Sequence, residues 1–310
     1  MQGMGLILNQ VSLMAIFAFC GFLLARNKLL SRQGLEDLAN LLITVLSPAT
    51  ILNAFAAIHI ERKILTNVAI VLTGALLSLL LPIFLSSFFL RHEDDDAKAV
   101  YRFALTFSNC GYIGLPMIQA LVGIEGVFYG SLYTSLQTIF MWSYGVKVMS
   151  TERLKGKAFL RSILKNPNNI AVLIGFFFML SRLEMPSLLS SALQGFSQTL
   201  APISMLILGG QICYYDLADF WKKGKLYKIC AFRNLLLPLA LLLPSLLLVP
   251  NRLLILAYVL PTACPIAMNT ALLSILYRRD VKLAVQLVTL STLLSALTLP
   301  VIAALCSLPG

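Results

Sequence analysis

Apolar runs long enough to cross a lipid bilayer recur along this chain, separated by short polar segments. A membrane-spanning helix needs about 20 mostly apolar residues. The pattern predicts ten such helices, over residues 4–25, 35–58, 64–90, 100–122, 127–149, 167–182, 187–213, 227–249, 252–276 and 283–307. The sixth run is short for a span, so its crossing needs independent support.

The composition is that of a membrane protein. Hydrophobic residues make up 59% of the 310 residues and charged residues only 12%, whereas a soluble protein carries about 25% charged residues. The net charge of +11 comes from basic residues in short loops between apolar runs. That pattern indicates membrane topology and not nucleic-acid binding. No soluble domain is expected, and residues 1–28 are expected to form a first span and not a cleaved signal peptide.

The distribution of lysine and arginine predicts how the spans are oriented. With the N-terminus outside, 20 of the 24 basic residues, Arg233 among them, fall on the inner side of the membrane. The four on the outer side are Arg62, Lys63, Arg182 and Arg252. Because cytoplasmic loops carry the excess of positive charge, both termini are expected to be extracytoplasmic. The same count supports a sixth crossing, since without it the basic clusters at 222–233 and 278–282 would lie outside.

Glycine, proline and asparagine interrupt two of the predicted spans. Span four contains "SNCGYIGLP" at 108–116, and span nine contains "LPTACPIAMN" at 260–269. Proline leaves a backbone carbonyl unpaired, and such backbone survives at membrane depth only against protein or a water-filled cavity. Corresponding breaks in two halves point to the binding site of a secondary transporter, where half-helix N-termini attract anions. Simple proline kinks are the alternative, and we favour them for Pro82, Pro238 and Pro244.

Ten spans with both termini outside can divide into two sets of five with opposite orientation. Prolines occur in spans two, three and four and again in spans seven, eight and nine, whereas Pro300 in span ten has no counterpart in span five. We therefore expect a first five-helix repeat over 1–150, a cytoplasmic linker over 151–166, and a second, inverted repeat over 167–310.

Four stretches resemble the auxin efflux carrier family, whose bacterial members include malate- and malonate-permease-like proteins. They are "LSPATILNAF" at 46–55, "FSNCGYIGLPMIQAL" at 107–121, "APISMLILGGQI" at 201–212, and the block that begins "YVLPTACPIAMNTALL" at 258 and runs to 300. The resemblance covers nearly the whole chain. It implies two inverted five-helix repeats, a crossing of broken helices four and nine at their prolines, small organic anions as substrates, and a fold related to the bile acid/sodium symporters.

Neutral polar residues at the two breaks are the candidates for substrate binding, because an asparagine amide can donate to a carboxylate. The predicted set comprises Asn53, Asn109, Gly111, Gly114, Pro116, Gln119, Pro261, Pro265, Asn269 and Thr270. Asn53 and Gln211 are the weaker candidates, since Asn53 could equally bond between helices. Which of Pro261 and Pro265 marks the crossing stays open. No catalytic residue, metal site or cofactor is expected, and the six cysteines form no C-x-x-C pair.

The acidic residues and both histidines fall in loops or at span ends. We expect no ionisable residue at the membrane midplane, so a carboxylate relay for protons is not predicted. The segment "HEDDDAK" at 92–98 looks like half of the magnesium–diphosphate site of membrane prenyltransferases. Such enzymes need a second aspartate cluster, which this chain lacks. The enzyme hypothesis is therefore rejected in favour of a solvated loop.

These observations predict an all-α integral membrane protein of the cell membrane, expected in a bacterial inner membrane. The predicted function is secondary transport of a small organic anion by alternating access. The substrate would be an auxin-like monocarboxylate or a dicarboxylate such as malate or malonate. The alternatives are a sodium-coupled organic anion symporter of the bile-acid type and an anion channel, which would not saturate with substrate. Expected partners are the anion and membrane lipid, and no nucleic acid; a homodimer, and a proton or sodium as coupling ion, are left open.

Overall fold

The computed structural model describes residues 2–56, 62–91, 93–150, 165–181, 183, 185–214 and 224–306. Within these ranges the chain is helical apart from short connections, and its only β pairing is one isolated bridge. Nearly all of the predicted linker 151–166 lies outside the described residues, as do His59 and His92.

The helices of the first half follow the predicted apolar runs. They are α1 (Gln2–Arg26), α2 (Arg32–Leu41), the π-helical turn η1 (Leu42–Leu46), α3 (Ser47–Ala56), α4 (Arg62–Phe89), α5 (Asp95–Thr106), η2 (Cys110–Gly114), α6 (Leu115–Phe140), η3 (Met141–Gly145) and α7 (Val146–Met149). In α6 the chain turns at Gly123, whose φ of 71° and ψ of −161° are strained for any residue with a side chain. This turn lies between predicted spans four and five.

The second half contains α9 (Pro167–Ser181), α10 (Ser187–Cys213), α11 (Gly224–Ala231), η5 (Phe232–Leu236), α12 (Leu237–Leu248), α13 (Arg252–Ala263), α14 (Asn269–Leu276) and α15 (Val281–Cys306). Each predicted range therefore contains helix. Five described stretches, 32–56, 64–89, 110–149, 224–248 and 281–306, are long and apolar enough to cross a membrane. The protein is all-helical as predicted, whereas ten crossings and the inverted repeat stay predictions.

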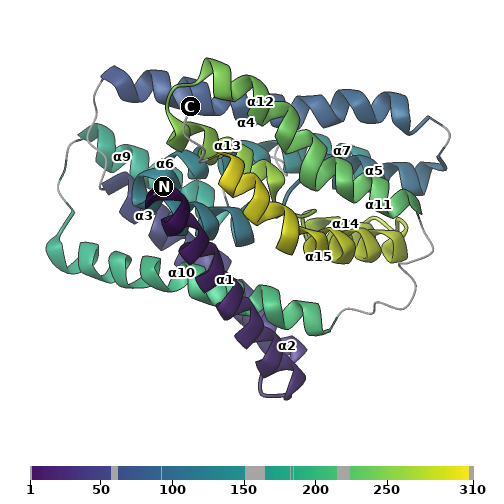
Figure 1. Ribbon diagram of the computed structural model, residues 1–310, viewed down its shortest axis with the longest axis horizontal. Coiled ribbons are helices and arrows are strands. Elements are labelled where there is room, and N and C mark those ends of the chain that lie inside the picture. The colour runs from purple at the N-terminus through teal and green to yellow at the C-terminus, as the bar shows by residue number, and fades with distance from the viewer. Residues whose placement is uncertain are drawn as a thin grey trace.

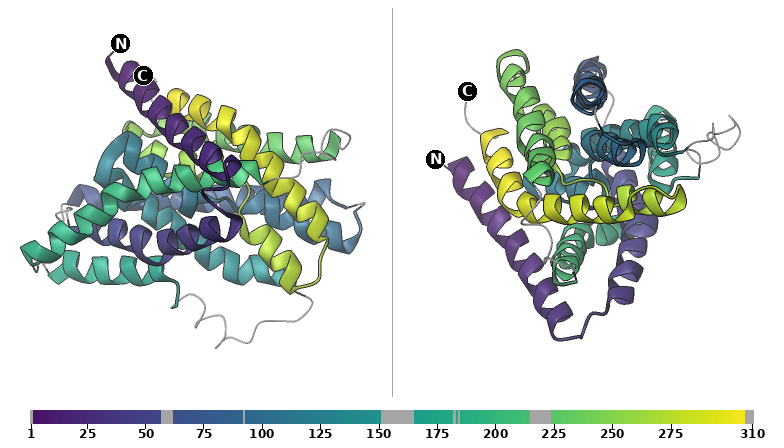
Figure 2. Two further views of the ribbon diagram at one scale, coloured as in Figure 1. Left: turned by 90° about the horizontal axis from the view of Figure 1, so that it is seen from below. Right: turned by 90° about the vertical axis from the view of Figure 1, so that its right-hand side faces the viewer.

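The helices form a bundle around α13 (Figure 1), which packs against α4, α6, α12 and α15. Every residue from Leu254 to Cys264 is buried, so this helix faces protein along its length. On another side of the bundle α1 lies along α10. The start of α1 and the end of α15 lie near each other in both views of Figure 2.

The acidic segment at 93–96 holds helices together. Asp94 caps α5 by accepting a hydrogen bond from the Ala97 N–H at 2.9 Å. Asp96 pairs with Arg279 at 2.5 Å, and Glu93 pairs with Lys225. These contacts give three of the four acids of the "EDDD" run structural partners, and the aspartates of the run form the start of α5 where the sequence predicted a solvated loop.

Glycines let α1 and α10 approach closely, as small residues do at membrane helix interfaces. A Cβ added at Gly209 would lie 1.6 Å from the carbonyl oxygen of Ala18. Gly209→Ala must therefore push the two backbones apart, and we expect a loss of about 1–3 kcal/mol of stability. The melting temperature of the purified protein measures this loss. Gly195→Ala in the same helix is the matched control, because its Cβ would meet nothing within 4 Å; equal melting temperatures for the two variants would contradict the expected clash.

Candidate functional site

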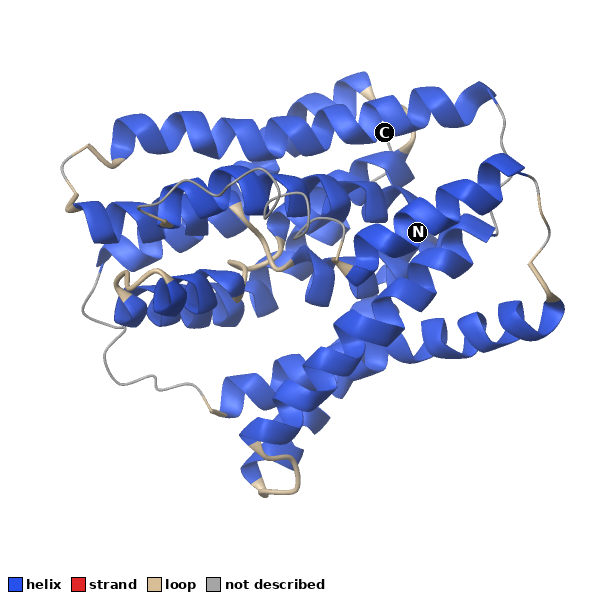
Figure 3. Ribbon diagram, turned by 180° about the vertical axis from the view of Figure 1, so that it is seen from behind, coloured by secondary structure: helices blue, strands red, loops and turns tan. Residues whose placement is uncertain are grey.

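The two predicted breaks lie side by side inside the bundle. The chain is non-helical between α5 and η2 and again between α13 and α14, and Figure 3 shows loop segments in the middle of the bundle. The Asn109 N–H donates to the Pro265 carbonyl at 2.7 Å, and the Ala267 N–H donates to the Phe107 carbonyl at 3.1 Å. The two segments thus pair antiparallel, and the proximity expected from the sequence is confirmed.

The prolines occupy different places relative to the breaks. Pro265 lies in the non-helical segment, whereas Pro261 lies within α13 and Pro116 near the start of α6. Gly114 brings the first break against the second, since a Cβ added there would lie 3.2 Å from the Cys264 sulfur. Of the two prolines left open above, Pro265 is therefore the one at the point where the segments pair.

Gln137 of α6 holds the first break from the side. Its Oε1 accepts hydrogen bonds from the Ser108 N–H at 3.2 Å and from the Ser108 hydroxyl at 2.8 Å. Its Nε2 donates to the Ser108 carbonyl at 2.8 Å and contacts the Cys110 sulfur at 3.1 Å. This single side chain satisfies both backbone polar groups of Ser108, which lipid could not do. Gln137 is not among the site residues predicted from the sequence, although an amide within an otherwise apolar predicted span is a usable signal.

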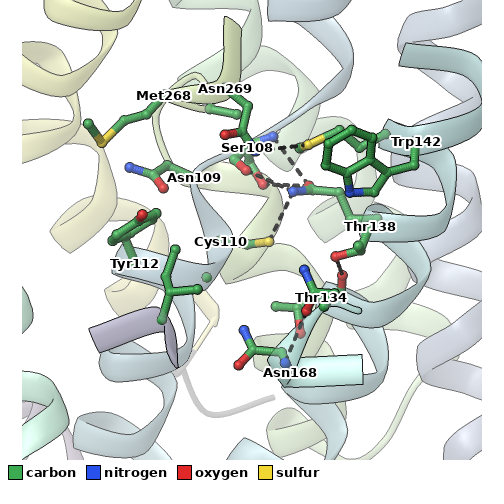
Figure 4. Close-up of a pocket in the computed structure, with 16 residues that line it drawn as sticks. Ser108, Asn109, Cys110, Tyr112, Thr134, Thr138, Trp142, Asn168, Met268 and Asn269 are labelled. Carbon is green, nitrogen blue, oxygen red and sulfur yellow. Dashed lines mark hydrogen bonds between the residues drawn. The ribbon is translucent and has the colours of Figure 1, made fainter. Parts of the chain in front are cut away.

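A cavity of about 240 Å³ opens beside the paired segments (Figure 4). It is lined by Ile43, Ser108, Asn109, Cys110, Gly111, Tyr112, Thr134, Gln137, Thr138, Met141, Trp142, Asn166, Asn168, Ala267, Met268 and Asn269. Amide and hydroxyl groups mix with apolar and aromatic groups. None of these lining residues carries a formal charge.

Three of the predicted site residues line this cavity. They are Asn109 and Gly111 from the first break and Asn269 from the second. Asn109 is 8% exposed, and the Asn269 amide lies 3.0 Å from the Met141 sulfur. The structure therefore brings one asparagine from each half of the chain to a single cavity.

The other predicted residues lie outside the cavity lining. Gln119 donates its amide to the Ser197 carbonyl and hydroxyl oxygens at 2.9 and 2.7 Å, so it joins α6 to α10. Asn53 on α3 is half-buried away from the lining, and Thr270 is fully buried. Gly114, Pro116, Pro261 and Pro265 shape the breaks without lining the cavity.

Half-helix starts and π-helical turns converge on the cavity. The helical stretch η2–α6 begins at Cys110 and α14 begins at Asn269, and both residues line the cavity. Helix N-termini carry partial positive charge. Of the four π-helical turns in the described residues, η1, η2 and η3 also contribute lining residues. Such turns are frequent at functional sites.

The comparison with known families agrees with this architecture. A family model described as "Membrane transport protein" matches residues 6–303. The chain belongs to this membrane transport protein family. The family is the auxin efflux carrier family that the sequence motifs resemble, so the predicted membership is confirmed over nearly the whole chain. Membership and the apolar helices together place the protein in a membrane.

One relative of this membrane transport protein is an uncharacterized transporter of Methanothermobacter thermautotrophicus. The two are 25% identical over 198 residues. The match covers 64% of this chain and 64% of the relative's own length. Both comparisons concern transport proteins, which argues against an enzyme.

Arg233 corrects one expectation about this transport protein. From its place in the sequence, Arg233 is expected among the solvent-facing cations of the inner loops. In the structure Arg233 lies in η5 with 0% exposure, and its guanidinium donates to the Thr262 carbonyl beside the second break. The count of basic residues missed this because the flanking apolar run alone does not reveal where the side chain packs.

Proposed function

We propose that the protein is a secondary transporter that moves a small organic anion across the cell membrane by alternating access. The proposal rests on one observation: Asn109 and Asn269 line the same cavity, and each lies at or next to the start of a half-helix. Amide donors and helix N-termini bind a carboxylate without a full charge at the cavity wall. Such binding is weak enough for the anion to leave, which transport requires.

The size and chemistry of the cavity support a small substrate. Its volume of about 240 Å³ lies below the roughly 300–1,000 Å³ of typical drug-sized ligand sites. Trp142, Met141 and Met268 add apolar surface to the same lining. A carboxylate with a short apolar body, such as malonate, malate or a compact auxin-like monocarboxylate, matches this combination.

The proposed movement uses the two repeats. In our proposal the broken helices four and nine cross where their segments pair, and the repeats 1–150 and 167–310 are related by inversion. The cavity would open alternately to either side as the helices around it shift. A protein embedded in lipid with both termini extracytoplasmic fits this scheme, and a homodimer is compatible with it.

Uptake by proteoliposomes tests the function. Purified protein should accumulate at least one labelled acid from a panel of malonate, malate, succinate and indole-3-acetate, and the rate should saturate with concentration. Protein-free liposomes are the control. Parallel runs with a sodium gradient, a pH gradient and neither distinguish a sodium symporter from proton coupling. Non-saturating flux would favour a channel, and the absence of uptake for every acid tested by monodisperse protein would overturn the proposal for this panel.

Orientation in the membrane gives a separate prediction. The excess of Lys and Arg on one side predicts that residue 156, outside the described residues, is cytoplasmic. In a cysteine-free background, Gly156→Cys should resist an impermeant thiol reagent in intact cells and react after permeabilisation. Pro250→Cys, on the opposite predicted side, should react in intact cells. The reverse labelling pattern would contradict the proposed topology.

A further inference from the structure

Arg233 is a buried cation without a counter-ion among the described residues. Its side chain is 0% exposed, and no described carboxylate forms an ion pair with it. One nitrogen donates to the Thr262 carbonyl, while Nε has no hydrogen-bond partner. An unpaired buried charge is costly, so its presence beside the break needs a reason.

The break itself explains only part of this arrangement. In an unbroken helix the Ile266 N–H would bond to the Thr262 carbonyl, but it donates instead to the Ser291 hydroxyl at 3.0 Å. Arg233 therefore caps a carbonyl freed at the end of α13, as basic side chains do at helix C-termini. A neutral amide could provide that hydrogen bond. The neighbouring Asn234 does so for the Ser291 carbonyl, at 2.7 Å.

The guanidinium does not line the cavity but lies beside the second break. The Thr262 carbonyl that it contacts lies three residues before Pro265, whose carbonyl accepts a hydrogen bond from the N–H of the lining residue Asn109. The guanidinium charge also acts on Cys110 and Cys264. Cys110 is itself a lining residue. In a buried environment of low dielectric constant the field of a unit charge is only weakly screened, so the charge acts beyond the atoms that it contacts.

We propose that Arg233 supplies a fixed positive charge that keeps the cavity at positive electrostatic potential. This potential would select small anions over neutral and cationic solutes. The role as a selector of transported anions rests on the proposed function. The potential itself does not, and it can be measured without a substrate. An ionisable residue within a membrane protein is a functional candidate by default, and here the missing counter-ion is the bound anion.

A thiol placed in the cavity reports this potential. Gly111 lines the cavity, and a Cβ added there meets nothing within 4 Å. Gly111→Cys would be made with alanine at the six native cysteines, Cys20, Cys110, Cys213, Cys230, Cys264 and Cys306. The purified protein is treated with anionic sulfonatoethyl and with cationic trimethylammonioethyl methanethiosulfonate. The rate with the anionic reagent is divided by the rate with the cationic reagent, and this ratio is divided by the same ratio for free 2-mercaptoethanol. A structural change that alters access to the thiol changes both rates alike, so it leaves the normalised ratio unchanged.

Neutralising Arg233 should lower this ratio. We expect Arg233→Gln to reduce the anionic-to-cationic ratio roughly tenfold, and Arg233→Lys, which keeps the charge, to retain it within about twofold. Lys228→Gln is the matched control, because it removes one positive charge from an exposed position five residues earlier and should leave the ratio unchanged. An unchanged ratio in Arg233→Gln overturns the proposal.

A second measurement covers the case in which Arg233→Gln does not fold. With Arg233 intact, the normalised ratio at Gly111→Cys should exceed one, and a ratio at or below one overturns the proposal without any change at Arg233. The uptake panel is read separately. If the potential depends on Arg233 but no acid is taken up, the positive potential of the cavity stands and the proposed transport function is overturned for this panel. Saturable anion uptake with an unchanged ratio would instead support the transport function and overturn the role of Arg233.

Discussion

Asn109→Ala and Asn269→Ala should each weaken binding and transport of the substrate anion about 10- to 150-fold. Each substitution removes one amide donor to a charged group, a loss of about 1.5–3 kcal/mol. Both side chains line the cavity, one from each break, so the two variants should have similar effects. The measurements are the affinity of the purified protein for a verified substrate and the initial rate of uptake in proteoliposomes.

Asn53→Ala is the matched control for these two variants. It removes the same amide from another helix of the first half, at a half-buried position outside the cavity lining. Its effect on affinity should be clearly smaller. All three proteins must be monodisperse with similar melting temperatures, because a misfolded variant would mimic a binding defect. Wild-type affinity and uptake in both Asn109→Ala and Asn269→Ala would place the substrate site elsewhere.

Gln137→Leu should abolish transport and strongly destabilise the protein. The substitution leaves the N–H and the carbonyl of Ser108 without the hydrogen bonds that Gln137 provides. Each buried polar group left unpaired costs about 1–3 kcal/mol, so the expected loss of stability is about 2–6 kcal/mol. The melting temperature of the purified protein and the rate of substrate uptake measure the two effects.

Thr138→Val provides the control beside Gln137. Thr138 also lines the cavity, and its hydroxyl donates only to the Thr134 carbonyl within the same helix, at 2.8 Å. Removing this hydroxyl leaves the first break supported, so stability should stay close to wild type. If Gln137→Leu proved no less stable than Thr138→Val, Gln137 would not be the support of the break.

Much of the secondary structure was predictable because its causes are local. The length of each apolar run sets whether a helix can span a bilayer, and helix was found within every predicted range. The breaks were predictable for the same reason. Proline and asparagine at 108–116 and at 260–269 disfavour helix wherever the chain folds. The positions of Asn109 and Asn269 as residues beside those breaks followed directly from the sequence.

What only the tertiary structure decided are contacts between segments far apart in the chain. The hydrogen bond from Asn109 to Pro265 shows that Pro265, and not Pro261, lies where the two broken segments pair. The support of Ser108 by Gln137 and the burial of Arg233 against Thr262 depend on how α6 and η5 pack around the breaks. Patterns of charge and hydropathy describe each residue only together with its neighbours in the sequence. They cannot show that an arginine at the edge of an apolar run points inward, because its surroundings come from helices that the chain reaches only after folding.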